Sequence, residues 1–143
     1  MSLFQQHTKA GWTVGAAGLI ALGLGVMGLV NQDSQLAAVG LNPADHASDD
    51  PLRVTMTSSS VAAMNTGAIY LLGVAKGWSW FPALTVATRS AQAIGFLTMM
   101  ANGRASSAYT AAAVWEAAGA VITAGAIWWD WRQAKSAAKR VAA

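Results

Sequence analysis

Cysteine is absent from the 143 residues of the sequence, and charged residues are few. The absence of cysteine excludes disulfide bonds, thiolate nucleophiles and metal sites built from cysteine. Asp, Glu, Lys and Arg together make up 10% of the chain, far below the roughly 25% that is usual in soluble domains. A soluble four-helix bundle of this length needs more charge on its outward faces. We therefore predict an integral membrane protein of one domain.

The sequence also lacks the short motifs that mark common enzyme sites. It contains no phosphate-binding loop, no dinucleotide-binding glycine pattern, no His-Glu-x-x-His and no Gly-x-Ser-x-Gly. The net charge of +3 is small and gathered toward the C-terminus, so nucleic acid is not predicted as a partner. No cofactor is predicted either, and the lipid bilayer is the first partner expected.

Four apolar stretches are long enough to cross a bilayer, which takes about 20 helical residues. They cover about residues 11–30, 54–75, 81–101 and 107–129. The first is longer than the apolar region of a typical signal peptide, so we expect a retained helix. The second begins with hydroxyl side chains, which we expect to bond back to the backbone or to face other helices. The predicted fold is all-α, a bundle of four transmembrane helices within residues 1–131.

Basic residues predict the orientation of these spans. Four spans place both termini on one side, and that side carries Lys9, Lys76, Arg132, Lys135, Lys139 and Arg140. The opposite side carries only Arg53 and Arg104. Under the positive-inside rule, this asymmetry favours both termini in the cytoplasm. Six tryptophans fall near the same interface, as expected of an aromatic belt: Trp12, Trp78, Trp80, Trp128, Trp129 and Trp131.

The regions outside the spans differ in charge. The outer loop, residues 31–52, is acidic and contains Asp33, Asp45, Asp49 and Asp50. His46 lies among them, but one histidine in a soluble loop is normally solvated, so no metal site is predicted. Residues 132–143 form a basic tail, which we expect to be a helical extension attracted to anionic headgroups.

Arg89 and Glu116 are charged residues inside two of the apolar stretches. A charge near the hydrocarbon centre costs at least about 2.5–3.5 kcal/mol and is normally paired. Arg89 lies 14 residues before the turn near Gly103 and Glu116 lies 13 after it, so adjacent antiparallel helices bring the two level. Asn65 and Arg89 lie 12 residues on either side of the turn near Gly77. We therefore predict one polar layer of Asn65, Arg89 and Glu116.

Two interpretations of this layer remain open. In the first, Arg89 and Glu116 form a buried ion pair that holds two helices in register. In the second, the layer is a pocket for a lipophilic small molecule, in which Arg89 binds or polarises a ligand oxygen. Glu116 then orients Arg89 or shuttles a proton, as acid/base isomerisation or cyclisation requires. Further ligand contacts are predicted for Asn65, Gln92, Tyr70 and Trp115.

The first span contributes glycines rather than charge. Gly11, Gly15, Gly18 and Gly25, with Leu22 between them, follow a 4-3-4-3 spacing and form one stripe on a helix. Such a stripe predicts close helix packing. The alternative is that the missing side chains leave a cavity beside the polar layer.

Three segments carry a resemblance to a known group of proteins. They are the glycine-rich residues 18–25, the Ala-Ala-x-Gly-Leu-Asn-Pro sequence of residues 37–43, and Asn65-Thr-Gly67 with Leu-Leu-Gly73 in the second span. In these features the chain resembles the small four-helix integral membrane proteins of the DUF4267 and DUF4345 type. The resemblance implies a membrane bundle, with Arg53 matching an arginine at the start of the second span, and it implies no established chemistry.

Other functions compete with a ligand pocket. The glycine stripe and the tryptophans also suit a non-catalytic accessory subunit, in which they contact partner membrane subunits or other copies of the chain. A small homo-oligomeric channel or transporter is disfavoured, because four spans leave little protein for a gated path and no inverted repeat is visible.

Overall fold

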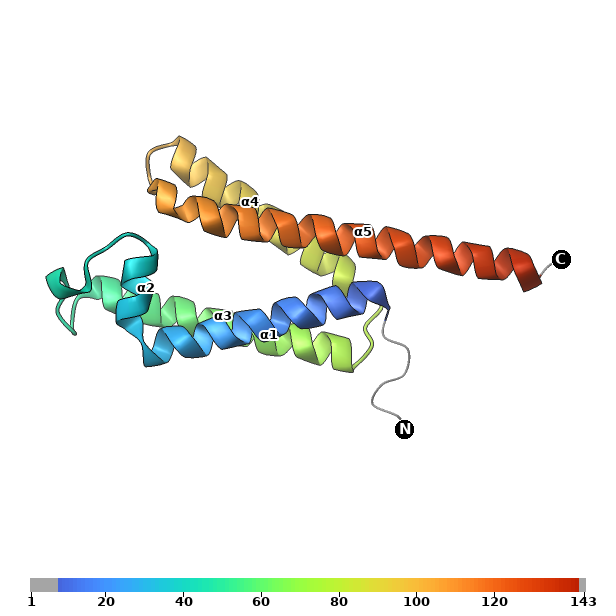
Figure 1. Cartoon of the computed structure of the whole chain (residues 1–143), viewed down its shortest axis with the longest axis horizontal. Helices are drawn as coiled ribbons and strands as arrows, with labels where there is room; N and C mark the ends of the chain where they lie inside the picture. The colour runs from blue at the N-terminus through green and yellow to red at the C-terminus, as the bar shows by residue number, and fades with distance from the viewer. Residues whose placement is uncertain (1–7, 142–143) are drawn as a thin grey trace.

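The computed structural model describes residues 8–141, so the outer limits of the predicted membrane domain (residue 1) and tail (residue 143) lie outside the described residues. The described chain is all-helical, as predicted, and Figure 1 shows the arrangement. Its elements are α1 (Lys9–Val30), α2 (Gln32–Ala38), the 3-10 turn η1 (Pro43–Asp45), α3 (Pro51–Ala75), α4 (Phe81–Ala101), the 3-10 turn η2 (Ser107–Tyr109) and α5 (Thr110–Val141). The helix α5 continues without a break into the predicted tail as far as Val141.

The four long helices pack as two hairpins rather than as one closed bundle. The helix α1 lies along α3, and α4 lies along α5 (Figure 1). The predicted layer of Asn65, Arg89 and Glu116 requires the consecutive helices α3 and α4 to pack side by side, and within residues 8–141 they do not. The reason is that the small-residue face of α3 packs against α1. The hairpins meet through α1 and α5 and diverge toward α2.

Hydrogen bonds link the two hairpins near the start of α1. The Asp130 carboxylate on α5 accepts from the backbone amides of Lys9 and Ala10, at 3.2 and 2.9 Å. One helical turn further, the Thr13 hydroxyl donates to that of Thr123 at 3.2 Å. A carboxylate at a helix N-terminus satisfies free amides and complements the helix dipole. We call these five residues the α1–α5 joint.

Glycines bring α1 and α3 into backbone contact. A Cβ atom added to Gly67 would stand 2.6 Å from the carbonyl oxygen of Gly18, and one added to Gly25 would stand 2.7 Å from a carbonyl oxygen of α3. The predicted close packing is therefore confirmed at Gly18 and Gly25, where α3 fills the stripe and leaves no cavity. The contact does not extend to Gly11 and Gly15, where an added Cβ would meet nothing of α3 closer than 3.9 Å.

The hydroxyl side chains at the start of α3 bond back to their own helix, as predicted. Each donates to the carbonyl oxygen four residues earlier, at 2.9 to 3.1 Å: Thr55, Thr57, Ser58, Ser59 and Ser60. Two of them also hold α2, because Gln32 donates to Thr57 at 2.5 Å and Gln35 donates to Ser60 at 2.7 Å. These polar groups are thereby satisfied within the protein.

Arg53 organises the outer loop, a role that the sequence did not reveal. Its Nε donates to the carbonyl oxygen of His46 at 3.0 Å, its Nη2 to that of Pro43 at 3.0 Å, and its Nη1 to Asp33 at 2.7 Å. His46 itself lies 2.8 Å from Asp50, which caps α3 by accepting from the amide of Leu52 at 2.8 Å. One guanidinium thus ties three separate parts of the loop to the start of α3.

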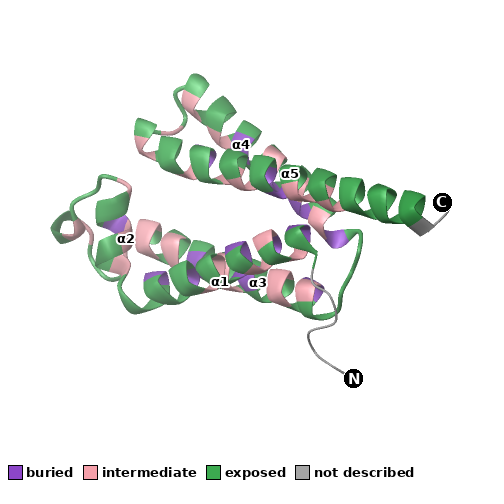
Figure 2. Cartoon of the chain, turned by 45° about the vertical axis from the view of Figure 1, so that its right-hand side comes forward, coloured by how far each residue is buried: buried purple, intermediate pink, exposed green. Residues whose placement is uncertain are grey.

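Large apolar side chains point outward on all four long helices. Leu19, Ile69, Ile94 and Val121 are between 52% and 72% exposed. Figure 2 shows exposed positions over most of the helical surface, with the buried ones between the paired helices. Two segments, α1 and Ser107–Arg140, are long and apolar enough to cross a membrane. The helices α3 and α4 have a lower mean hydropathy than these two segments, because α3 begins with polar turns and α4 contains the Arg89 region.

Gly67→Ala tests the backbone contact between α1 and α3. The added Cβ has no room, so overpacking is expected to lower the free energy of unfolding by about 1–3 kcal/mol. The matched control is Gly23→Ala on α1, where a Cβ meets nothing within 4 Å. That change should be neutral, or stabilising by up to about 1 kcal/mol. Thermal unfolding in detergent micelles measures both, and equal stabilities would contradict the packing described.

Asp50→Asn tests the cap of α3. The contact with His46, and then the amide of Leu52, holds the pKa of Asp50 below its ordinary value of 3.8. The ionised carboxylate therefore stabilises the fold at pH values above 3.8, and this contribution is lost as the pH falls through the lowered pKa. The variant should unfold at a lower temperature than the wild type near neutral pH, and the difference should shrink on acidification. A difference that persists unchanged in acid would count against the cap.

Candidate functional site

Arg89 and Glu116 form an ion pair between α4 and α5. The Arg89 Nε lies 2.8 Å from the Glu116 Oε2, and the two side chains are 6% and 18% exposed. The predicted pairing across the Gly103 turn is therefore confirmed. Inside a low-dielectric environment, such a pair is stable only while both members are present.

The sequence places the pair at the centre of the α4–α5 contact. The buried residues of α4 are spaced four apart along one face: Phe81, Thr85, Arg89 and Ala93. The buried residues of α5 include Ala113, Ala120 and Thr123. Glu116 stands between the two alanines of α5. Because small residues let the backbones approach closely on both sides of the pair, the two long charged side chains meet without separating the helices.

Gly119 and Trp115 complete the seat of the Arg89 guanidinium. A Cβ added to Gly119 would overlap the guanidinium, which lies directly against this glycine. The guanidinium carbon also lies 5.4 Å from the ring centroid of Trp115, within cation–π range. Trp115 was predicted as a ligand contact, and the structure places it beside Arg89. Gly119 was missed, although its position three residues after Glu116 puts it on the same helical face.

The guanidinium keeps hydrogen-bond donors free. Among residues 8–141, its Nε is the one nitrogen that meets a hydrogen-bond acceptor, and neither Nη1 nor Nη2 is fully enclosed. Arginine presents five N–H donors in a planar fork. Unpaired donors are costly in an apolar medium. Glu116 therefore binds one edge of the guanidinium, and the N–H groups of the other edge are available to an oxygen atom.

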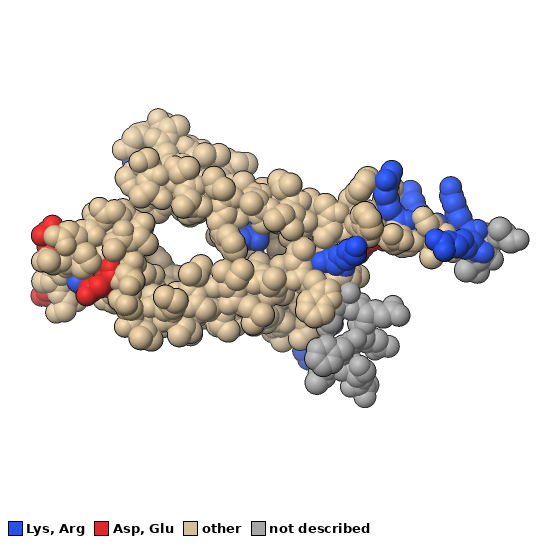
Figure 3. Space-filling model, in the orientation of Figure 1, with Lys and Arg blue, Asp and Glu red and all other residues tan. Residues whose placement is uncertain are grey.

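The space beside the pair is open. Figure 3 shows the molecule hollowed between the two hairpins, with basic side-chain atoms visible between the hairpins on the side of the opening nearer the far end of α5. The opening follows from the architecture, because α3 and α4 separate after the turn that joins them. We call this space the inter-hairpin opening.

Three of the predicted ligand contacts are not brought to the pair. Asn65 is exposed on α3, because that helix packs on α1 and not on α4, so an equal depth does not make it a neighbour of Arg89. Gln92 is exposed because the buried face of α4 continues from Arg89 through Ala93, one position further along. Tyr70 packs edge-on against Phe81, with ring centroids 5.9 Å apart. The predicted layer of Asn65, Arg89 and Glu116 is reduced to its charged pair.

Glu116→Gln measures the strength of the pair. Removing one partner of a buried ion pair leaves an uncompensated charge, so we expect a loss of about 3 kcal/mol in the free energy of unfolding. Replacing both residues, as Arg89→Met with Glu116→Met, should recover most of that loss, because a buried apolar pair is often as stable as an ionic one. Denaturant unfolding in micelles gives both values. A double variant less stable than Glu116→Gln would show that the coupling is not electrostatic.

Comparison of the chain with protein-family models, with curated proteins and with solved structures finds no match. The resemblance to the DUF4267 and DUF4345 proteins therefore stays a prediction. No relative supplies a substrate or a partner, and the function has to be argued from the Arg89–Glu116 pair and its surroundings.

Proposed function

We propose that this chain is a four-span membrane protein that binds a lipophilic small molecule between its hairpins, through the Arg89–Glu116 pair. The ligand carries a carboxylate or carbonyl oxygen, which accepts from the free edge of the Arg89 guanidinium. Both termini face the cytoplasm, and the last turns of α5 form a basic extension at the headgroup level.

Helix lengths and surfaces support four spans. At 1.5 Å per residue, the 25 residues of α3 and the 21 residues of α4 extend over about 37 and 31 Å. The hydrocarbon core is about 30 Å thick, so both helices are long enough. The polar turns of α3 carry no unsatisfied hydroxyl, and outward apolar side chains on every long helix suit contact with lipid.

The charge distribution supports the orientation. Figure 3 shows acidic side chains gathered around the α2 end and basic ones along the far end of α5. The basic end carries Lys9, Lys76 and the exposed residues of the α5 extension, and the positive-inside rule places such an end in the cytoplasm. Arg132 and Lys135 lie over the rings of Trp128 and Trp131, at 4.2 and 3.7 Å, as expected of an interfacial segment.

The single observation that carries the ligand proposal is the free edge of Arg89. Glu116 neutralises the guanidinium and fixes its direction through Nε, while Gly119 and Trp115 hold its plane. The remaining donors then point where no residue of the described chain accepts from them. A carboxylate that only locks an arginine in place is held most strongly by two parallel N–H bonds, whereas Glu116 takes only the Nε bond. A ligand oxygen satisfies the second edge.

The same pair has the parts for acid/base chemistry on such a ligand. Arg89 would polarise the ligand oxygen, and the Oε1 of Glu116, which accepts no hydrogen bond from residues 8–141, would take up or return a proton. The reaction proposed on this basis is the isomerisation or cyclisation of a lipophilic substrate. Binding is the function that the geometry supports best, and this reaction is its extension.

Arg89→Gln in lipid nanodiscs tests the proposal with a photoactivatable palmitic acid as the probe. The wild type should be labelled between the hairpins, and the variant should lose at least about tenfold in labelling, since a charge-assisted bond is worth about 1.5–3 kcal/mol. Arg104→Gln, in the exposed turn before α5, is the matched control and should label as the wild type does. The methyl ester of the probe should label at an intermediate level.

Equal labelling of folded Arg89→Gln and wild type would overturn the ligand site. If the protein then purified in mild detergent only within a larger assembly, the accessory-subunit interpretation would gain support. A stable small species that still excludes the probe would instead favour the structural ion pair.

A further inference from the structure

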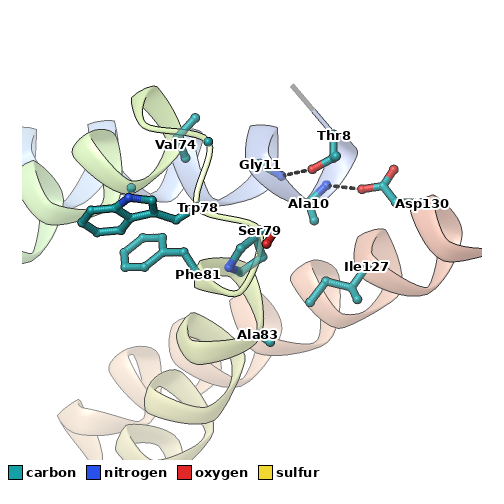
Figure 4. A pocket seen from close by; sticks show the side chains of 13 residues that line it. Thr8, Ala10, Gly11, Val74, Trp78, Ser79, Phe81, Ala83, Ile127 and Asp130 are labelled. Atoms are coloured by element: carbon teal, nitrogen blue, oxygen red, sulfur yellow. Dashed lines mark hydrogen bonds between the residues drawn. The ribbon is translucent and has the colours of Figure 1, made fainter. Parts of the chain in front are cut away.

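A second cavity lies away from the Arg89–Glu116 pair. It has a volume of about 320 Å³ and is lined by the first turn of α1, the turn between α3 and α4, and the part of α5 near Asp130 (Figure 4). Neither Arg89 nor Glu116 lines it. Phe81 lines the cavity and precedes Arg89 by eight residues, or about 12 Å along α4. The volume falls within the range of small-molecule sites.

Aromatic rings form one wall of this cavity. The Phe81 ring is 3% exposed and meets Trp78 and Trp80 edge-on, with centroids 5.8 and 5.7 Å apart. Trp78 in turn stacks on Trp80 at 5.6 Å. The positive φ of Gly77 (64°) allows the sharp turn that presents Trp78. These three contacts hold Phe81 and Trp78, the aromatic residues of the lining, in place, and Trp80 supports them from outside the cavity.

A carboxylate closes the other end. Figure 4 shows Asp130 bonded to the amide of Ala10, and its other oxygen accepts from Lys9. Each carboxylate oxygen thus takes one bond, whereas the group offers about four acceptor sites in total. Asp130 is the one ionisable residue among the described residues of the lining. The Lys9 ammonium is directed elsewhere, over the ring of Trp129 at 4.3 Å.

We propose that this cavity binds an ammonium group, supplied by a lipid headgroup or by a free amine. Aromatic faces attract cations, most strongly at tryptophan, and a carboxylate with spare acceptor sites adds direct charge pairing. An anion would face Asp130 with no lysine or arginine in the lining to offset the repulsion. With the proposed spans, the tryptophan-rich end lies at the headgroup level, where ammonium groups of phospholipids are abundant.

Choline is the probe for the free ammonium, and 3,3-dimethylbutan-1-ol, its neutral isostere, is the comparison. Calorimetric titration of the full chain in uncharged detergent should show choline binding at least about tenfold tighter than the isostere. Asp130→Asn keeps an acceptor for α1 but removes the charge, and it should abolish that preference. Ala83→Leu fills the cavity from α4 and should abolish binding while leaving Asp130 in place. Ala87→Leu, one turn further on α4 and outside the lining, is the control and should bind normally.

Nanodiscs distinguish the two sources. If the ammonium comes from a headgroup, native mass spectrometry should find phosphatidylethanolamine or phosphatidylcholine retained over phosphatidylglycerol by the wild type and by Ala87→Leu, and not by Ala83→Leu. If it comes from a free amine, choline should bind equally in all three lipids. Equal affinity for choline and its isostere would overturn the proposal, and so would undiminished choline binding by Asp130→Asn or Ala83→Leu.

Discussion

The joint between α1 and α5 decides how this molecule is put together. Each hairpin has its own contact: backbone against backbone for α1 and α3, and small residues around an ion pair for α4 and α5. What relates one hairpin to the other is a carboxylate at the N-terminus of α1, supported by Thr13 and Thr123 one turn away. Because the joint is confined to one end, the hairpins diverge beyond it, and the space beside Arg89 exists. The cavity at Asp130 is a product of the same joint.

Counting residues from a turn predicted the Arg89–Glu116 pair correctly but did not predict which helices pack together. The turn near Gly103 connects two helices that pack together, so equal counts led directly to the Arg89–Glu116 pair. The turn near Gly77 connects two helices that do not, so the same arithmetic placed Asn65 level with Arg89 but on another hairpin. The distance of a residue from a turn can be counted from the helical rise, whereas the helix that packs beside it depends on which helix faces are complementary. The all-helical class and the charged pair were therefore predictable, and the surroundings of the pair were not.

The glycines show the same limit of prediction from the sequence. The spacing of Gly18 and Gly25 predicted a face for close helix packing, and the structure confirms it. Gly119 carries no comparable signal, because a lone glycine in a long helix fits many roles, and only the position of the Arg89 guanidinium gives it meaning. The partner of Asp130 could not be predicted either, because an acidic residue between two tryptophans says nothing about a helix N-terminus that is 120 residues distant in the sequence.

Because the α1–α5 joint lies at one end of the molecule, the two hairpins are joined there and lie apart at the other end. Each hairpin is a stiff arm roughly 30 Å long, so a rotation of about ten degrees at the pivot moves the far end by about 5 Å, close to the pitch of one helical turn. The loop that Arg53 ties together sits at the end of one arm, so such a rotation would displace it by the full distance of about 5 Å. Arg89 lies partway along the other, so the gap in front of its guanidinium changes by a fraction of that distance, set by its separation from Asp130.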